Sequence, residues 1–118
     1  MALLSACATT TVYPAPTVGQ FAAVDGAVNE ARARGVAQDP AAVQHLRLAE
    51  MQLAEAKQHI AAGDNRGASL LLARADADAE LSQMLQRQTE ATAEARTTET
   101  ELRETQAQTP VQPRPGQP

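Results

Sequence analysis

The scarcity of large apolar side chains is the feature that most limits what this sequence can fold into. The chain has one phenylalanine, one tyrosine and no tryptophan, although 43% of its 118 residues are hydrophobic, because much of that fraction is alanine. With so few large side chains the core must be thin. Ordering a residue costs roughly 1.5 kcal/mol, while burial returns about 25 cal/mol per Å², so a thin core stabilises the fold only marginally. The composition predicts a small helical protein of marginal stability, for which oligomerisation or partner binding is a natural remedy.

Residues 17–87 carry the apolar spacing of a helical domain. From Thr17 onward, apolar residues recur at intervals of three and four, which places them on one helix face, and this first helix should end near Gly35. The residues of that face are Phe21, Val24, Val28 and Ala31.

A second helix should begin at Asp39-Pro40, because aspartate caps free N–H groups and proline at the first helical position needs no donor. Gly63 supplies a residue that tolerates a left-handed C-terminal cap. Between them runs a narrow seam of alternating three- and four-residue steps, typical of a face that packs on another helix. Its residues are Leu46, Ala49, Leu53, Ala56 and Ile60.

The stretch from Gly63 to Gly67 holds two glycines and two turn-forming side chains, which predicts a chain reversal into an antiparallel third helix. The apolar positions of that helix include Leu71, Leu72 and Ala75, and alanine at facing positions would let the two backbones approach closely. The expected fold class is all-α: an antiparallel helical hairpin or a three-helix bundle with a long C-terminal helix and disordered ends.

Three segments outside residues 17–87 lack an apolar face that could pack against another helix. Residues 8–16 read as an extended linker, and residues 88–107 as a polar helical extension or disorder, since their helix propensity is fair but β-branched threonines weaken it. Residues 108–118 are proline-rich and predict an extended, disordered tail.

The lone cysteine, Cys7, follows Leu4, Ser5 and Ala6, an arrangement that resembles the lipobox at which bacteria attach diacylglycerol to a cysteine. Residues 1–7 then represent the end of a truncated signal peptide. Only six residues precede Cys7, without a positive region or an apolar stretch of about 7 to 15 residues. Three alternatives follow: the true start lies upstream, the leader was trimmed, or Cys7 is an ordinary free thiol.

Together with the lipobox-like start, the run from Ala73 to Leu81 (Ala-Arg-Ala-Asp-Ala-Asp-Ala-Glu-Leu) is similar to one uncharacterised, alanine-rich bacterial lipoprotein family, a domain of unknown function. Members of that family also occur ahead of OmpA-like peptidoglycan-binding domains. The resemblance covers about residues 1–87 and implies a helical envelope protein. It carries over no catalytic or ligand residues, and peptidoglycan as a partner has no support here because this sequence contains no OmpA-like domain.

Several function classes find no support in the residues. The formal net charge is -4, so the composition gives no sign of the basic surface that binds the phosphates of nucleic acid. His45 and His59 lie fourteen positions apart, hence about 21 Å along one helix, and cannot share a metal. Ser69 and Ser82 sit within helical patterns and not on a turn that would present a nucleophile. We therefore expect no metal, no cofactor, no small-molecule substrate and no enzymatic activity.

The leading hypothesis is a non-catalytic lipoprotein of the bacterial envelope, anchored through Cys7 to the periplasmic face of the outer membrane. An aspartate directly after the cysteine would resemble an inner-membrane retention signal. This chain has Ala8 there, which favours the outer membrane. The helices would offer their narrow seam to a protein partner or to a second copy, in a structural or adaptor role. The rival hypothesis is a small cytosolic helical interaction protein with unmodified Cys7.

Overall fold

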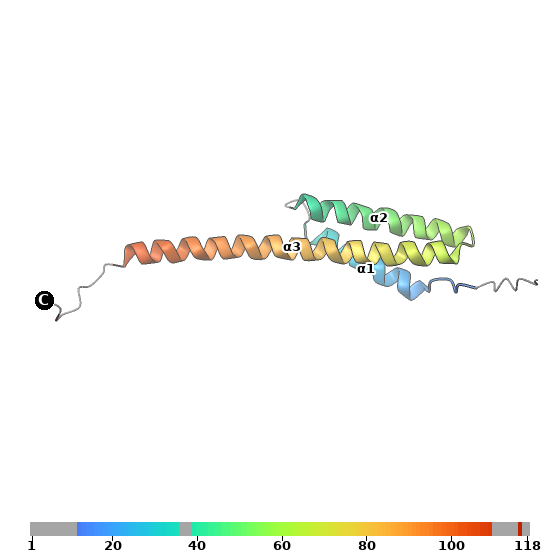
Figure 1. Cartoon of the computed structure of the whole chain (residues 1–118), viewed down its shortest axis with the longest axis horizontal. Coiled ribbons are helices and arrows are strands. Elements are labelled where there is room, and N and C mark those ends of the chain that lie inside the picture. Colours follow the sequence, from blue (N-terminus) through green and yellow to red (C-terminus); the bar gives the residue numbers. More distant parts are fainter. Residues whose placement is uncertain (1–11, 36–38, 110–115, 117–118) are drawn as a thin grey trace, which may run out of the picture.

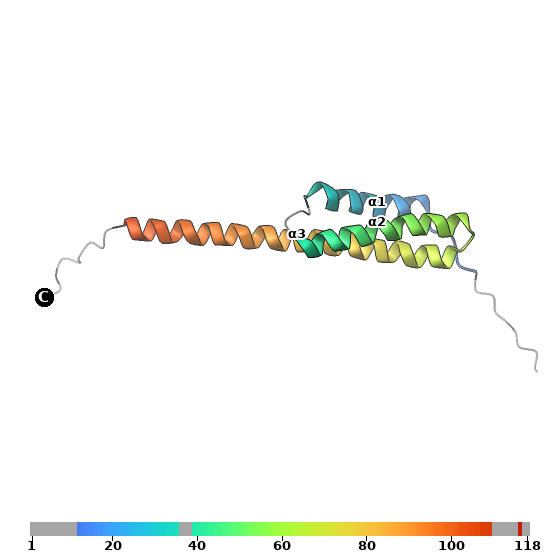
Figure 2. The same cartoon turned by 90° about the horizontal axis from the view of Figure 1, so that it is seen from above.

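The computed structural model of the chain describes residues 12–35, 39–109 and 116, and these residues form three α-helices and no strand. Helix α1 spans Val18–Ala33, α2 spans Pro40–Ala61 and α3 spans Asn65–Gln108. Helices α2 and α3 form an antiparallel hairpin, and α1 packs on both, with more contact to α3 (Figures 1 and 2). The all-α prediction is confirmed, and the first helix completes a three-helix bundle.

Helix α1 begins where the sequence places its start. The Thr17 hydroxyl accepts a hydrogen bond from the Gln20 backbone N–H at 3.1 Å, while the Gln20 side chain accepts from the Thr17 N–H at 2.7 Å. This reciprocal capping box satisfies two amides that the first helical turn leaves unpaired. At the other end, Gly35 takes a φ of 77°, a left-handed conformation that stops the helix.

Helix α2 has the predicted cap. One carboxylate oxygen of Asp39 accepts from the backbone N–H groups of Ala41 and Ala42, at 2.9 and 3.2 Å, and Pro40 occupies the first helical position. Gly63 ends the helix with a φ of 78°. Both expected boundaries of this helix are therefore confirmed.

The reversal into α3 is tighter than the sequence suggests. The predicted turn ran from Gly63 to Gly67, but α3 already begins at Asn65, with Asp64 capping the Gly67 N–H at 2.9 Å. A Cβ atom added to Gly67 would collide with the Asp64 carboxylate and the His59 ring. Gly67 therefore serves close packing inside the first turn of α3 and does not form part of a loop.

The core is thin, as the composition requires. Its large buried members are two valines of α1 and leucines of α2 and α3, and the other buried members of the cluster are alanines. The largest side chain that is completely buried is that of Ser82. The core cluster consists of Val24, Val28, Ala31, Leu46, Ala49, Leu53, Ala56, Leu72, Ala75 and Ala79, with Phe21, Ala27 and Leu71 packed partly against it.

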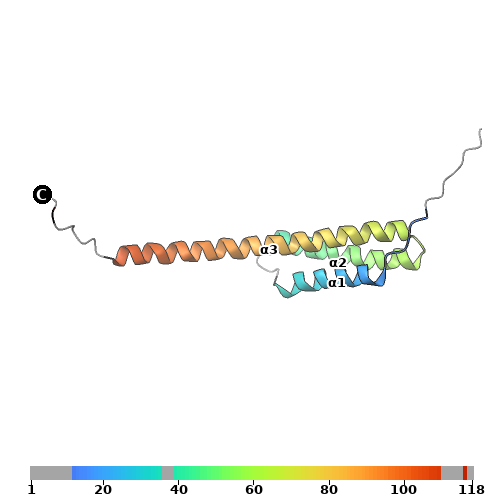
Figure 3. The same ribbon diagram turned by 90° about the horizontal axis from the view of Figure 1, so that it is seen from below.

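Helix α3 is 44 residues long and continues well past the other two helices (Figures 1 and 3). At 1.5 Å per residue it measures roughly 66 Å. Residues 88–107, for which helix and disorder were both open, are helical throughout. Residues 12–17 have no regular secondary structure. The predicted disordered tail, residues 108–118, begins too early, because Gln108 is the last residue of α3 and Thr109 caps the helix. Apart from Gly116, the rest of the predicted disordered ends lies outside the described residues.

Within the residues that the structure describes, no helix is both long enough and apolar enough to cross a lipid bilayer.

The close approach of the helices predicts that α2 tolerates a larger side chain only on its exposed face. We expect Ala56→Leu to lower the free energy of unfolding by about 1–3 kcal/mol, because Ala56 is fully buried and extra methylenes must push the helices apart. Ala54→Leu, at an exposed position of the same helix, should change it by less than about 0.5 kcal/mol. Urea unfolding followed by circular dichroism measures both, and equal effects would contradict the packing described here.

The two aspartate caps predict a loss of stability in acid. Hydrogen bonds from the Ala42 N–H and the Thr89 hydroxyl lower the pKa of Asp39, and the Gly67 N–H and the His59 ring lower the pKa of Asp64. A carboxyl group with a lowered folded-state pKa stabilises fully above its unfolded value of about 3.9, and this contribution disappears as the pH falls through the folded value.

We therefore expect the melting temperature to fall steeply below about pH 4. The double variant Asp39→Asn with Asp64→Asn keeps two capping oxygens that do not titrate, so its melting temperature should depend less on pH in that range. Glu94→Gln, which removes an exposed carboxylate of α3 outside both caps, serves as the control for lost charge. Parallel pH profiles for the double variant and the native chain would refute the role of the caps.

Candidate interaction surface

The residues of the lipobox-like start, Leu4, Ser5, Ala6 and Cys7, lie outside the described residues. The described part of the predicted linker is held at the α2–α3 turn. There the Asn65 side-chain amide donates to the Tyr13 carbonyl at 3.2 Å, and the Arg66 guanidinium lies 5.2 Å from the centre of the Tyr13 ring. The chain thus enters the bundle at the turn, opposite the free end of α3 (Figure 1).

The seam predicted from the sequence lies inside the molecule. Most of its members are buried in the core between the three helices, and the remaining two, Ile60 and Leu71, are half-buried. The buried members are Leu46, Ala49, Leu53, Ala56, Leu72 and Ala75. The hypothesis that this seam is offered to a partner is therefore wrong, because the chain's own helices cover it.

A second line of residues lies on the opposite face of α3, and we call it the outer stripe. It repeats with the same three- and four-residue steps as the seam but is rotated by roughly half a turn at 100° per residue. Its large members are partly or largely exposed: Leu81 at 38%, Met84 at 58% and Leu102 at 55%. The outer stripe comprises Leu81, Met84, Gln88, Ala91, Ala95, Thr98, Leu102 and Thr105.

The outer stripe continues from the bundle onto the free part of α3. Among the described residues, the last hydrogen bond between a side chain of this helix and the bundle is that from the Thr89 hydroxyl to Asp39, at 3.0 Å. From residue 90 to residue 109 every side chain is exposed. This part of α3 packs on nothing within the described chain, so its surface is available to another molecule.

Threonines weaken the free part of α3 as an isolated helix. The hydroxyls of five of them donate to the carbonyl four residues earlier, an arrangement that slightly destabilises and bends helices. The intrahelical pair between Glu99 and Arg103 adds only a small contribution, because both side chains are exposed. Contact with a partner would therefore stabilise this segment.

Sequence reasoning missed a set of buried polar side chains on α3 that hold the bundle together. The Ser82 hydroxyl donates to the Ala42 carbonyl of α2 at 2.8 Å, and the Gln83 amide donates to the Ala27 carbonyl of α1 at 3.0 Å. Both lie among residues that read as polar surface positions. The alternating four- and three-residue steps that follow Ala75 and Ala79 lead to Ser82 and Gln86, and this spacing was a sequence feature that could have revealed those two. Gln83 lies one position beyond that line.

Gln86 completes this set at the C-terminal end of α1. Its amide donates to the Ala31 carbonyl at 3.1 Å and lies 3.4 Å from the Ser82 hydroxyl, and the residue is 4% exposed. The Ala31 carbonyl belongs to the last turn of α1, where a helix cannot satisfy its own acceptors. Gln86 therefore fixes the end of α1 to α3.

The two histidines also serve contacts between segments. His45 Nδ1 lies 2.7 Å from a carboxylate oxygen of Asp78 on α3, whose other oxygen accepts from the Gln52 amide at 2.9 Å. His59 Nδ1 lies 2.7 Å from the Asp64 carboxylate in the turn. Within the part of the chain that the structure describes, no three His, Cys, Asp or Glu side chains are grouped closely enough to hold a metal.

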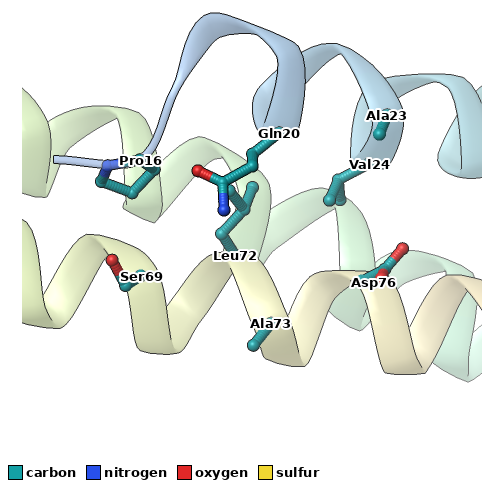
Figure 4. Close-up of a pocket in the computed structure, with 8 residues that line it drawn as sticks. All are labelled: Pro16, Gln20, Ala23, Val24, Ser69, Leu72, Ala73 and Asp76. Atoms are coloured by element: carbon teal, nitrogen blue, oxygen red, sulfur yellow. The ribbon is translucent and has the colours of Figure 1, made fainter. Parts of the chain in front are cut away.

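A hollow of about 280 Å³ lies between α1 and α3 (Figure 4). Its polar side chains are those of Gln20, Ser69 and Asp76, and Gln20 is already engaged in the cap of α1. Ser69 and Asp76 are seven residues apart on one helix, hence about 10 Å along its axis, too far for a carboxylate to activate a hydroxyl. The hollow therefore does not assemble a nucleophile with its base.

Comparisons with known proteins place the chain in no group: no family model matches it, and neither does a curated protein or a solved structure.

The contact between Gln86 and Ala31 predicts that α1 detaches first when the amide is lost. Gln86→Glu is isosteric, but it would bury a carboxylate against the Ala31 carbonyl, so we expect a destabilisation of about 3 kcal/mol at pH 7. At pH 4 the effect should be smaller, since a protonated carboxyl group can donate to that carbonyl. Hydrogen exchange should accelerate most at the amides of α1.

Gln58→Glu, at an exposed position of α2, introduces the same charge and should change the stability by less than about 0.5 kcal/mol. Uniform acceleration of exchange across all three helices in the Gln86 variant would show that Gln86 does not act specifically on α1.

Proposed function

We propose that this protein is a non-catalytic lipoprotein of the bacterial envelope, anchored to the outer membrane through acylated Cys7, which acts as a structural or adaptor protein through helix contacts of α3. The single observation that carries the adaptor role is the outer stripe, which continues from the bundle onto a free helix exposed on every side. A helical segment that packs on none of the described residues adds nothing to their core, whereas a regularly spaced stripe of small and apolar side chains along it is suited to binding another helix.

The anchor is supported by the sequence and by the position of the tether. Leu4, Ser5, Ala6 and Cys7 form the lipobox-like start, and the described residues that follow reach the bundle at the α2–α3 turn. A tether at this end leaves the outer stripe uncovered. Several acyl chains, each methylene contributing about 0.8 kcal/mol on burial, would hold the protein stably at a membrane surface.

The adaptor role is also supported by what the polar side chains do. His45, Asp78, Ser82, Gln83 and Gln86 all bridge one helix to another. Each therefore has a structural task in the bundle. The surface that remains for function is the outer stripe.

The anchor is tested by expressing the protein from its native upstream region and recording its intact mass in separated membrane fractions. We expect an acylated N-terminal Cys7 in the outer membrane, and loss of both acylation and outer-membrane recovery in Cys7→Ser, because the serine hydroxyl is not a lipidation acceptor. Thr10→Ala, a change three residues beyond the cysteine, should leave both unchanged.

An unmodified Met1 in the soluble fraction would overturn the proposal and favour the cytosolic helical interaction protein. Acylation with recovery in the inner membrane would retain the anchor and contradict the location.

A further inference from the structure

We propose that the outer stripe of α3 binds the outer stripe of a second copy of this chain, with the two helices antiparallel and residues 81–105 of each in contact. The inference deepens the proposed function by naming the partner of that surface. It depends on the stripe being an interaction surface, and not on how Cys7 is modified.

The spacing of the stripe fits a two-helix seam. Residues four and three apart alternate without interruption from Leu81 to Thr105, which is the repeat that keeps one line of residues facing a partner helix. The contacting length is about 36 Å at 1.5 Å per residue. In heptad terms the first positions are Leu81, Gln88, Ala95 and Leu102, and the fourth positions are Met84, Ala91, Thr98 and Thr105.

Antiparallel pairing matches the sizes of the side chains. In an antiparallel pair each first position faces a fourth position of the partner. If Leu81 of one copy faces Thr105 of the other, any two residues that face each other have numbers that sum to 186. Met84 then packs on Leu102, which joins the two largest exposed side chains of the stripe. Ala91 packs on Ala95 near the symmetry axis, where small residues let the backbones approach.

The charges that flank the outer stripe also favour antiparallel pairing. In the antiparallel pair Arg87 of one copy lies beside Glu101 of the other, and the symmetry repeats this attraction at the opposite end. One repulsion, between the two Glu94 residues, remains at the axis. A parallel pair would instead place Glu94 beside Glu99 of the other copy twice and leave Arg87 beside Thr92, so it contains repulsions without a compensating attraction.

The bundle does not obstruct this pairing. Helices α1 and α2 lie on the opposite face of α3, so each bundle faces away from the partner helix (Figures 2 and 3). The starts of the two α3 helices would be about 84 Å apart along the axis at 1.5 Å per residue. Tyr13 is held at the turn, so residues 8–12 of each linker remain, and these reach about 17 Å when extended, which allows both anchors to enter one membrane along which the pair lies.

The contact area is small, and five of the eight positions in the stripe are alanine, threonine or glutamine. A contact of this kind falls at the weak end of specific interfaces, so we expect a dissociation constant in the micromolar range. Pairing would also order the threonine-rich part of α3, and its helix content should rise with concentration.

The test uses the full chain with Cys7→Ser, which removes the native thiol. Sedimentation equilibrium should show a monomer and dimer in exchange. Chains carrying Met84→Cys mixed with chains carrying Leu102→Cys should form a mixed disulfide under mild oxidation, whereas either chain alone should form little. Disulfides within each separate sample would establish parallel pairing and overturn the antiparallel assignment, and a monomer at millimolar concentration would overturn the dimer altogether.

Charge exchange tests the same arrangement without cysteines. Arg87→Glu should weaken the dimer roughly tenfold, because two attractions become two repulsions, and Glu101→Arg should do the same. The double variant with both changes should restore the affinity, since the pair is present with its signs exchanged. Glu104→Arg, an exposed neighbour that faces away from the stripe, makes the same charge change as Glu101→Arg and should leave the affinity within about twofold.

The outcomes separate this inference from the anchor. A monomeric chain that is acylated and recovered in the outer membrane would overturn the dimer alone. A dimer whose Cys7 is unmodified would overturn the anchor alone.

Discussion

The close packing of α2 against α3 through alanine is the constraint on which the rest of the structure depends. Ala49, Ala56, Ala75 and Ala79 are completely buried, so the two backbones can approach as closely as methyl groups allow. Close approach compensates for the lack of aromatic side chains by increasing dispersion contacts per residue. It also leaves little volume for hydrophobic side chains, and the core contains few of them.

A core this thin has to be supplemented by hydrogen bonds, and these join α3 to both of the other helices. Ser82, Gln83 and Gln86 on α3 reach backbone carbonyls of α1 and α2, and Asp78 links α3 to two side chains of α2. The N–H groups of Gln83 and Gln86 reach their carbonyl acceptors in only one arrangement of the helices. They therefore specify the position of α1, which apolar contacts between short side chains would leave poorly defined.

Helix α3 has two faces with the same spacing and different roles. The inner face is covered by α1 and α2, and the outer face is exposed along the bundle and along the free part of the helix. The chain is tethered at the α2–α3 turn, where Asn65 and Arg66 hold Tyr13. A bundle that fixes one end of a long helix and leaves the outer face open is suited to presenting that face to another helix.

The starts and ends of α1 and α2 follow from the sequence alone, because the residues that specify them act within a few positions, whereas the start of α3 and the helical state of residues 88–107 do not. Thr17, Asp39-Pro40 and Gly63 mark helix ends through their own backbone preferences and side-chain oxygens, and the three- and four-residue spacing marks each apolar face. Only the tertiary structure decided which face meets which. The predicted seam became the core, the outer stripe became the free surface, and polar residues such as Gln86 became interior, because burial depends on the helix that lies opposite and not on the residue itself.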